Sequence, residues 1–489
     1  MRYHRKPLER LKNTLSIEIP ENHPTSPLHF TKFHPVFATS SKPKELYYDP
    51  NNRNQNNVPK FSGDFECGNL GQVFRTGPRL FEIHLLPDPT SYYSALWYFF
   101  KVENIPPGEY CFTIVGFFRD AHLHKLGVQP TALSLNAVAK GIGWQRFGNN
   151  LNFWCWKKGP SSEYALSFTF SVKEPDTIYF SYLYPYSYTD MRNHLTKLGP
   201  SIHCTILCNT LGGVEFPVIF WDADVQKCVN AKRYFSSHKS LLCLKKPLIV
   251  ITSRHHPGES NASYAMEGFM STLFNSGNED SERLLKNFSF LLIPMMNPDG
   301  VICGYYRPTL SGYDQNRVWI RPNRRSNPVE FILVSLLDQL VRSRPLIFFL
   351  DYHGHTAQCN AFSYGVFDEN CTLNEYESFF PQIMSRYNSV FDEAGSCTFN
   401  LDSFSSTMRV ALHNRYQIPF AYTLEMSFGG IDIGSNNFTQ MTPNTYRSVG
   451  VSTVPAIASM LLDQVPISQY ISNYFPPISR TTLCDPIFI

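Results

Sequence analysis

Two hydrophobic patterns divide most of the chain. Between residues 61 and 184, short apolar and aromatic runs alternate with turns that contain proline and glycine, as in LWYFFKVENIPPGEYCFTIVGF. Because side chains on a strand alternate between its two faces, this pattern predicts an antiparallel β-sandwich. From residue 185 to 480, strand-like runs are followed by helix-like runs, as in PLIVITSRHH and then NASYAMEGFMSTLF. Such alternation predicts an α/β domain with a mixed sheet and helices on its faces.

The first 60 residues follow neither pattern. They are rich in proline, asparagine, lysine and serine, and they end in NNRNQNNVPK. A segment with so few apolar residues cannot bury enough surface to offset the entropy that it loses on ordering. We therefore expect residues 1–60 to be a flexible leader, followed by a sandwich domain at 61–184 and an α/β domain at 185–480.

Composition narrows the classes of partner. The 43 Lys and Arg residues nearly balance the 40 Asp and Glu residues, and a net charge of +3 does not suggest a nucleic-acid partner. The start MRYHRKPLERLKN lacks the apolar core of a signal peptide, and no later stretch has about 18 consecutive apolar residues. We expect a cytoplasmic protein with no membrane partner, in which the 12 scattered cysteines are reduced thiols.

Polar side chains follow four of the strand-like segments. They are His256–Glu259, Asn297–Gly300, Asp351–His355 and Glu425. In open α/β sheets, ligands bind beyond the carboxyl ends of the strands. The four polar ends are therefore expected to meet at one site.

Three of these side chains are the types that bind catalytic zinc. Zinc takes imidazole and carboxylate ligands, and a catalytic site uses three of them; His256, Glu259 and His353 form such a set. A His-x-x-Glu turn occurs by chance, and a lone histidine such as His353 is more often a structural core residue. The two fragments together favour a metal site. His255 and His355 are the alternatives if the strand register is different, since neighbouring residues point to opposite sides.

Longer segments around these residues resemble a known family. TSRHHPGESNAS, IPMMNPDGV, YYRPTLSGYDQNR, LDYHGHT and YTLEMSFGG resemble, in this order, the signature segments of the cytosolic carboxypeptidases within the zinc metallocarboxypeptidases. FECGNL, LWYFFKVEN and YPYSYTD resemble their β-rich N-terminal domain. The resemblance implies a single Zn²⁺ bound by His256, Glu259 and His353. It also implies that Glu425 is the general base and acid of a peptidase reaction.

The same resemblance assigns one more catalytic residue and three substrate-binding residues. Asn316 and Arg317 match the pair that holds the terminal carboxylate, and Arg307 matches the arginine that stabilises the oxyanion. Arg409 matches an arginine that faces the side chain of the departing residue. Taken alone, any of these arginines is more often a surface ion-pair partner, and Arg409 could simply begin a surface helix.

The chain departs from the family pattern in two places. The usual Asp-Leu-Asn-Arg-Asn reads Asp-Gln-Asn-Arg-Val at residues 314–318, and the stretch after the second zinc histidine, HTAQC, lacks the basic residues common there. Many members of the family remove glutamates from C-terminal tails such as those of tubulin, so the resemblance implies protein or peptide C-termini as partners and microtubules as a location. Basic residues at 321–325 and 227–246 give modest support, although solvated surface charges are the commoner reading.

Two other functions fit the same residues. The first is a catalytically silent protein that binds acidic tails such as those of tubulin, against which the intact ligand set argues. The second is a zinc amidohydrolase acting on small acyl-amino acids, which would not need the long β-rich region. Zinc-dependent removal of C-terminal residues, with glutamates in acidic tails as the expected substrate, is the leading hypothesis.

Overall fold

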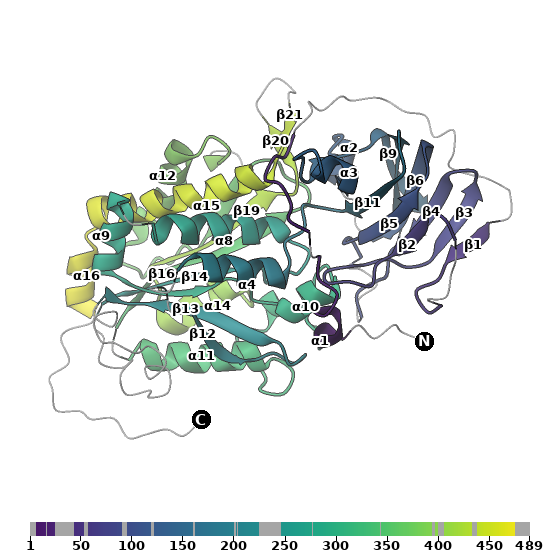
Figure 1. Ribbon diagram of the computed structural model, residues 1–489. Coiled ribbons are helices and arrows are strands. Elements are labelled where there is room, and N and C mark those ends of the chain that lie inside the picture. Colours follow the sequence, from purple (N-terminus) through teal and green to yellow (C-terminus); the bar gives the residue numbers. More distant parts are fainter. Residues whose placement is uncertain are drawn as a thin grey trace.

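The computed structural model describes fifteen stretches of the chain. These are residues 6–15, 17–24, 44–52, 57–89, 95–118, 122–159, 162–199, 202, 204–223, 246–275, 277–342, 344–393, 397–399, 405–432 and 438–474. Figure 1 shows a region of two sheets on the right and an α/β region on the left. Within the described stretches, no helix combines the length and the apolar character needed to cross a membrane.

The first region contains a six-stranded and a five-stranded sheet. The six-stranded sheet has the order β1 (Glu45–Tyr48), β3 (Val73–Gly77), β4 (Leu80–His84), β6 (Gly108–Phe117), β10 (Glu163–Val172) and β9 (Asn149–Lys157). The five-stranded sheet has the order β2 (Lys60–Ser62), β5 (Phe99–Ile105), β11 (Asp176–Ser181), β7 (Thr131–Ser134) and β8 (Gln145–Arg146). All pairs are antiparallel except β4 with β6, which is parallel. Two short helices connect strands along the chain: α2 (His122–Lys125) lies between β6 and β7, and α3 (Leu135–Val138) lies between β7 and β8.

Aromatic rings fill the space between the two sheets. Phe112 of β6 lies 5.1 Å from Phe180 of β11, and Phe81 of β4 lies 5.2 Å from Phe61 of β2, measured between ring centroids. Each contact joins one sheet to the other, and all four rings are buried. Face-to-face packing with inward residues that alternate along the strands is the geometry of a sandwich. The predicted sandwich is confirmed.

The second region is built on an eight-stranded mixed sheet. Its order is β12 (Cys204–Asn209), β13 (Glu215–Trp221), β15 (Ser289–Ile293), β14 (Leu248–Ser253), β16 (Leu346–His355), β19 (Phe420–Ser427), β17 (Ala361–Gly365) and β18 (Thr398–Phe399). The four central strands β15, β14, β16 and β19 are parallel. Every residue of β14 and β15 is buried, as expected for parallel strands covered on both faces. A hairpin of β20 (Gly430–Asp432) and β21 (Phe438–Gln440) follows β19.

Helices cover both faces of this sheet (Figure 1). One face carries α8 (Ser260–Leu273), α9 (Glu279–Asn287), α12 (Phe379–Tyr387) and α15 (Pro443–Ala458), and the other carries α11 (Pro328–Leu340) and α14 (Met408–Tyr416). Further helical segments in the described stretches are α4 (Tyr188–Lys197), α10 (Pro298–Cys303), η2 (Gln315–Arg317), η3 (Asn374–Tyr376), η4 (Ser459–Gln464) and α16 (Ile467–Tyr474). The predicted α/β fold with a mixed sheet is therefore confirmed.

Part of the expected flexible leader is ordered. Residues 7–10 form the short helix α1 (Pro7–Arg10), and β1 pairs with β3 of the sandwich. The buried guanidinium of Arg10 donates hydrogen bonds to the carbonyl oxygens of Phe65, Gly68 and Gly63, at 2.9, 2.7 and 3.0 Å. Composition did not reveal these contacts because their partners lie more than fifty residues away. Residues 1–5, 16, 25–43 and 53–56 lie outside the described stretches, and the domain limits at 61 and 184 stay predictions.

We expect Arg10→Ala to destabilise the protein by about 2–3 kcal/mol, because it leaves three buried carbonyls without a charged donor. Urea unfolding followed by fluorescence measures the change. Lys6→Ala is the matched control, since Lys6 forms only an exposed ion pair with Glu9 and should change stability by less than about 1 kcal/mol. Equal stabilities of the two variants would show that the Arg10 contacts do not anchor α1.

Candidate active site

The site residues lie at the carboxyl ends of β14, β16 and β19. His256 follows β14, Glu259 is the residue before α8, and His353 and Glu425 belong to β16 and β19. His353 is directly paired with Glu425 in the parallel register. Paired residues on neighbouring strands point to the same face, so this register brings a candidate ligand and the candidate base together.

His256, Glu259 and His353 form a buried group with the geometry of a metal site. One ligand atom from each lies within 4.8 Å of the others. Nδ1 of His256 is 2.7 Å from Oε1 of Glu259, and Nδ1 of His353 is 2.9 Å from its Oε2. Although burial favours the neutral acid, the two histidines hold the pKa of Glu259 well below its usual range. Glu259 is therefore an ionised carboxylate, as a metal ligand must be.

Two aspartates fix the orientation of these histidines. Nε2 of His353 lies 2.7 Å from Oδ2 of Asp351, and Nε2 of His256 lies 3.1 Å from Oδ1 of Asp314. Burial opposes ionisation of both aspartates, but His255 beside Asp351 and His256 beside Asp314 hold their pKa values well below the usual range. A carboxylate on Nε2 favours the tautomer in which Nδ1 keeps its lone pair for a metal. Both imidazoles and the carboxylate thus fit Zn²⁺.

A second group of possible ligands shares His353. It consists of His255, Asp351 and His353, also within 4.8 Å of one another. Nδ1 of the fully buried His255 lies 3.0 Å from Oδ1 of Asp351, and its ring stacks on that of His353 with centroids 5.5 Å apart. The alternation of a strand does not separate His255 from His256, because Arg254 has a φ of 63° and ends the extended backbone. His355 lies further along β16 and belongs to neither group.

Glu425 has an unsatisfied carboxylate in this site. Its Oε2 is buried and has no hydrogen-bond partner among the described residues. Burial raises the pKa of Glu425 to about 7; His353 opposes the rise and Glu259 adds to it. A carboxylate that is poorly solvated and weakly bonded is available for proton transfer.

Arg409 lies beside Glu425 and does not begin a surface helix. It is in the first turn of α14 and is 3% exposed, with its guanidinium 5.5 Å from the ring centre of Tyr364. Its Nε and Nη1 have no hydrogen-bond partner among the described residues. Burial lowers the pKa of Arg409 to about 10, and Glu425 is the nearby charge that most opposes this change. A buried cation with free donors can hold a substrate carboxylate.

The remaining candidates lie on one loop. Both Nε and Nη2 of Arg307 are 2.7 Å from Oδ2 of Asp314, so Arg307 contacts the aspartate that orients His256. The backbone N–H of Arg307 also donates to Asp88, which lies between β4 and β5 in the sandwich region. This hydrogen bond connects the site to the sandwich region.

Asn316 and Arg317 differ in their surroundings. Asn316 is buried, accepts a hydrogen bond from the backbone N–H of Met408, and has its Nδ2 3.1 Å from Nε2 of His353. Arg317 is exposed, and its Nη1 donates to the carbonyl oxygen of Asn316. The candidate residues therefore lie around the group of His256, Glu259 and His353, and Arg317 lies on the exposed side. Asp314 and Asp351 were not assigned a role from sequence, although Asp351 lies two residues before His353 on the same face of β16.

Comparisons with known proteins agree with this arrangement. Residues 235–447 match the model of the zinc carboxypeptidase family. Cytosolic carboxypeptidase 2 of Macaca fascicularis is 31% identical over 409 residues, which cover 81% of this chain and 47% of the relative. Cytosolic carboxypeptidase 3 of Bos taurus is 31% identical over 405 residues, covering 80% of this chain and 39% of the relative. The chain spans less than half the length of these relatives.

A solved structure has the same fold. The metallo-carboxypeptidase from Pseudomonas aeruginosa, in complex with (2-guanidinoethylmercapto)succinic acid, superposes with a TM-score of 0.66 at 22% identity. The match covers 82% of this chain and 98% of that one, so it includes both regions of the fold. The superposition shows the shared fold, and the sequence matches show that the chain belongs to the zinc carboxypeptidase family, with cytosolic carboxypeptidases among its relatives.

Proposed function

We propose that the protein is a zinc-dependent carboxypeptidase that removes residues from the C-termini of proteins or peptides and holds one Zn²⁺ per chain. The observation that carries this proposal is the buried group of His256, Glu259 and His353 beside the unbonded carboxylate of Glu425. When bound to this group, Zn²⁺ supplies a Lewis acid that polarises the scissile carbonyl and acidifies water.

The protein's own residues then carry the proton and the charge. Glu425 takes a proton from the attacking water and gives it to the amine that leaves. Arg307 lies on Asp314 next to His256, where its positive charge stabilises the oxygen anion that develops on the carbonyl. The two aspartates keep the histidine rings fixed during the reaction, so that no reorganisation is needed in the transition state.

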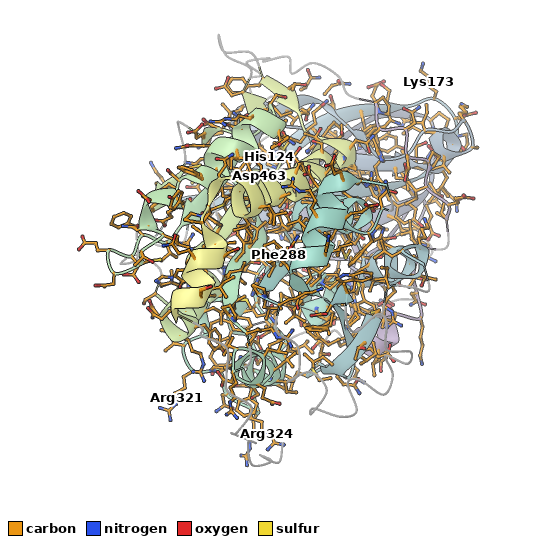
Figure 2. All side chains as sticks on the ribbon, turned by 90° about the vertical axis from the view of Figure 1, so that its left-hand side faces the viewer. His124, Lys173, Phe288, Arg321, Arg324 and Asp463 are labelled. Carbon is orange, nitrogen blue, oxygen red and sulfur yellow. The ribbon has the colours of Figure 1, made fainter. Side chains whose placement is uncertain are left out.

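The substrate class follows from the cations at the site. Arg317, supported by Asn316, binds the terminal carboxylate that defines an exopeptidase substrate. Arg409 offers unbonded donors in a buried position, which suits a second carboxylate on the departing residue, namely the side chain of glutamate. Arg321 and Arg324 project away from the body of the molecule (Figure 2) and add positive charge shortly after Arg317 in the chain.

Acidic tails such as those of tubulin are therefore the proposed substrates, and the cytoplasm, where microtubules lie, is the proposed location. The names of the relatives support the location. The basic residues at 227–245 lie outside the described stretches and give no structural support.

Incubation of the purified protein with tubulin and with synthetic glutamate-tailed peptides tests the proposal. We expect stepwise loss of C-terminal glutamates, seen by mass spectrometry and abolished by a chelator. Binding to the peptides without any loss of mass would indicate a silent binding protein instead. Turnover of small acyl-amino acids but not of peptides would indicate an amidohydrolase.

We expect Arg409→Ala to lower the preference for glutamate over leucine at the C-terminus by about tenfold or more, because a charge-assisted hydrogen bond contributes about 1.5–3 kcal/mol. The measurement is the ratio of kcat/KM for two peptides that differ only in the last residue. Arg415→Ala is the control on the same helix, since Arg415 forms an ion pair with Asp338 on the surface. An unchanged ratio in Arg409→Ala would exclude this role.

A further inference from the structure

A small cavity with a mixed apolar and polar lining lies apart from the histidine group, at the start of α11. It has a volume of about 30 Å³, room for one or two water-sized particles. Asp299 of α10, Gln315 of η2 and Glu330 of α11 line it, together with the hydroxyl-bearing residues Thr309, Ser311 and Ser326. No histidine or cysteine is among its lining residues, all of which are described. Its polar side chains therefore offer oxygen atoms to a ligand.

Two acceptor atoms of these residues have no hydrogen-bond partner. They are Oε1 of Glu330 and Oε1 of Gln315, on side chains that are each 2% exposed. Nε2 of Gln315 donates to the carbonyl oxygen of Met296 at 2.8 Å, which fixes the orientation of the amide and leaves its oxygen unbonded. A buried acceptor without a partner costs about 1–3 kcal/mol. A cation bound in the cavity would satisfy both atoms, because it attracts oxygen lone pairs.

The cavity is also lined by two buried carboxyl groups with no cation beside them among the described residues. Within the described part of the chain, neither Asp299 nor Glu330 has an ion-pair partner. Asp299 accepts hydrogen bonds only from neutral groups, the hydroxyl of Thr210 at 2.6 Å and the backbone N–H of Gly212 at 2.9 Å. Burial raises the pKa of Asp299, and it raises the pKa of Glu330 to about 7. The ionised form of two buried carboxyls is unfavourable unless a positive charge is bound nearby.

We propose that this cavity binds a calcium-class cation through Asp299, Gln315 and Glu330. Oxygen donors from carboxylates, an amide and hydroxyls are the ligands that Ca²⁺ prefers, and Ca²⁺ accepts irregular sets of them. Two carboxylates neutralise its two charges. The ion joins α10, η2 and the first turn of α11, and so it supports the loop that carries Asp314 and Asn316.

Proton binding competes with the cation at Glu330. The titratable groups that act on Glu330 are Asp299 of α10 and Cys208 of β12, while Gln315 contributes a neutral hydrogen bond. With a pKa of about 7, Glu330 is mostly neutral at about pH 6 and mostly ionised at about pH 8. The ionised fraction rises from about one tenth to about nine tenths, so the apparent affinity for Ca²⁺ should rise about tenfold over this range.

Calorimetric titration of the zinc-loaded full chain with CaCl₂ tests the site. We expect one Ca²⁺ per chain, bound about tenfold more tightly at about pH 8 than at about pH 6. Glu330→Gln should abolish this binding. Glu279→Gln, which changes an exposed glutamate in the first turn of α9, should leave it intact. His256→Ala should also retain it, so that the result does not depend on the zinc site.

Several results would overturn the proposal. Absence of Ca²⁺ uptake at both pH values would mean that water alone fills the cavity. Equal uptake by Glu330→Gln would place the ion elsewhere, and tighter binding of Mg²⁺ or Na⁺ in parallel titrations would exclude the calcium assignment. Circular dichroism in the absence of Ca²⁺ checks that Glu330→Gln is folded. If Glu330→Gln is not folded, Asp299→Asn replaces it in the titration after the same folding check.

Discussion

Glu425→Gln should lose about 10²–10⁴-fold in kcat while keeping its metal and its fold. The amide has the same shape as the carboxylate but cannot take a proton from water. Because Oε2 of Glu425 has no hydrogen-bond partner among the described residues, the change leaves no other group unpaired. Peptide turnover and zinc content by mass spectrometry measure the two effects separately.

Glu66→Gln is the matched control for this variant. Glu66 is also a buried carboxyl whose pKa burial raises to about 7, but it lies in the sandwich region and accepts a hydrogen bond from the backbone N–H of Thr189. Its replacement should leave kcat unchanged. Near-normal turnover in Glu425→Gln would show that another residue is the base.

The pH dependence of the rate has a definite sign. A general base must be ionised, so kcat/KM should fall as the pH falls through the pKa of Glu425. In the metal-free protein burial raises that pKa to about 7, and a bound dication lowers it because it favours the ionised form. We therefore expect an acid limb below about pH 7 in the zinc-loaded enzyme. A rate that rose as the pH fell through this region would contradict the assignment of Glu425 as base.

The sequence predicted the parts of the site that depend on local patterns. His256 and Glu259 occupy one turn, and His353 and Glu425 end strands whose apolar runs are easily recognised. Their convergence followed from the general rule that parallel strands present their carboxyl ends at one edge. The sandwich was predicted from the alternation of apolar and polar residues, because this alternation strongly restricts the register of each strand.

The contacts that were missed are those between distant segments. Asp314 is 58 residues from His256, and Arg10 is 55 residues from Phe65. No local propensity specifies such pairs, because they depend on how the elements pack. The expected separation of His255 from His256 failed for a related reason. The strand ends at Ser253 because Arg254, the residue before His255, has a positive φ, and a non-glycine residue gives little warning of that conformation.

The two possible ligand groups make opposite predictions for neighbouring histidines. If Zn²⁺ is held by His256, Glu259 and His353, then His256→Ala should contain no stoichiometric zinc after dialysis and should lose its activity, because two protein ligands form too weak a site. His255→Ala should keep zinc with an affinity lowered by about 10–100-fold, since His255 contacts the metal group through Asp351.

His353→Ala removes a member common to both groups and should behave like His256→Ala, which makes it the positive control for metal loss. Zinc per chain, measured after dialysis against a weak chelator, is the readout and does not depend on activity. The reverse result, with zinc kept in His256→Ala and lost in His255→Ala, would move the metal to the group of His255, Asp351 and His353. Glu425 would still be paired with His353 in the sheet, but Glu259 would then lose its role as a ligand.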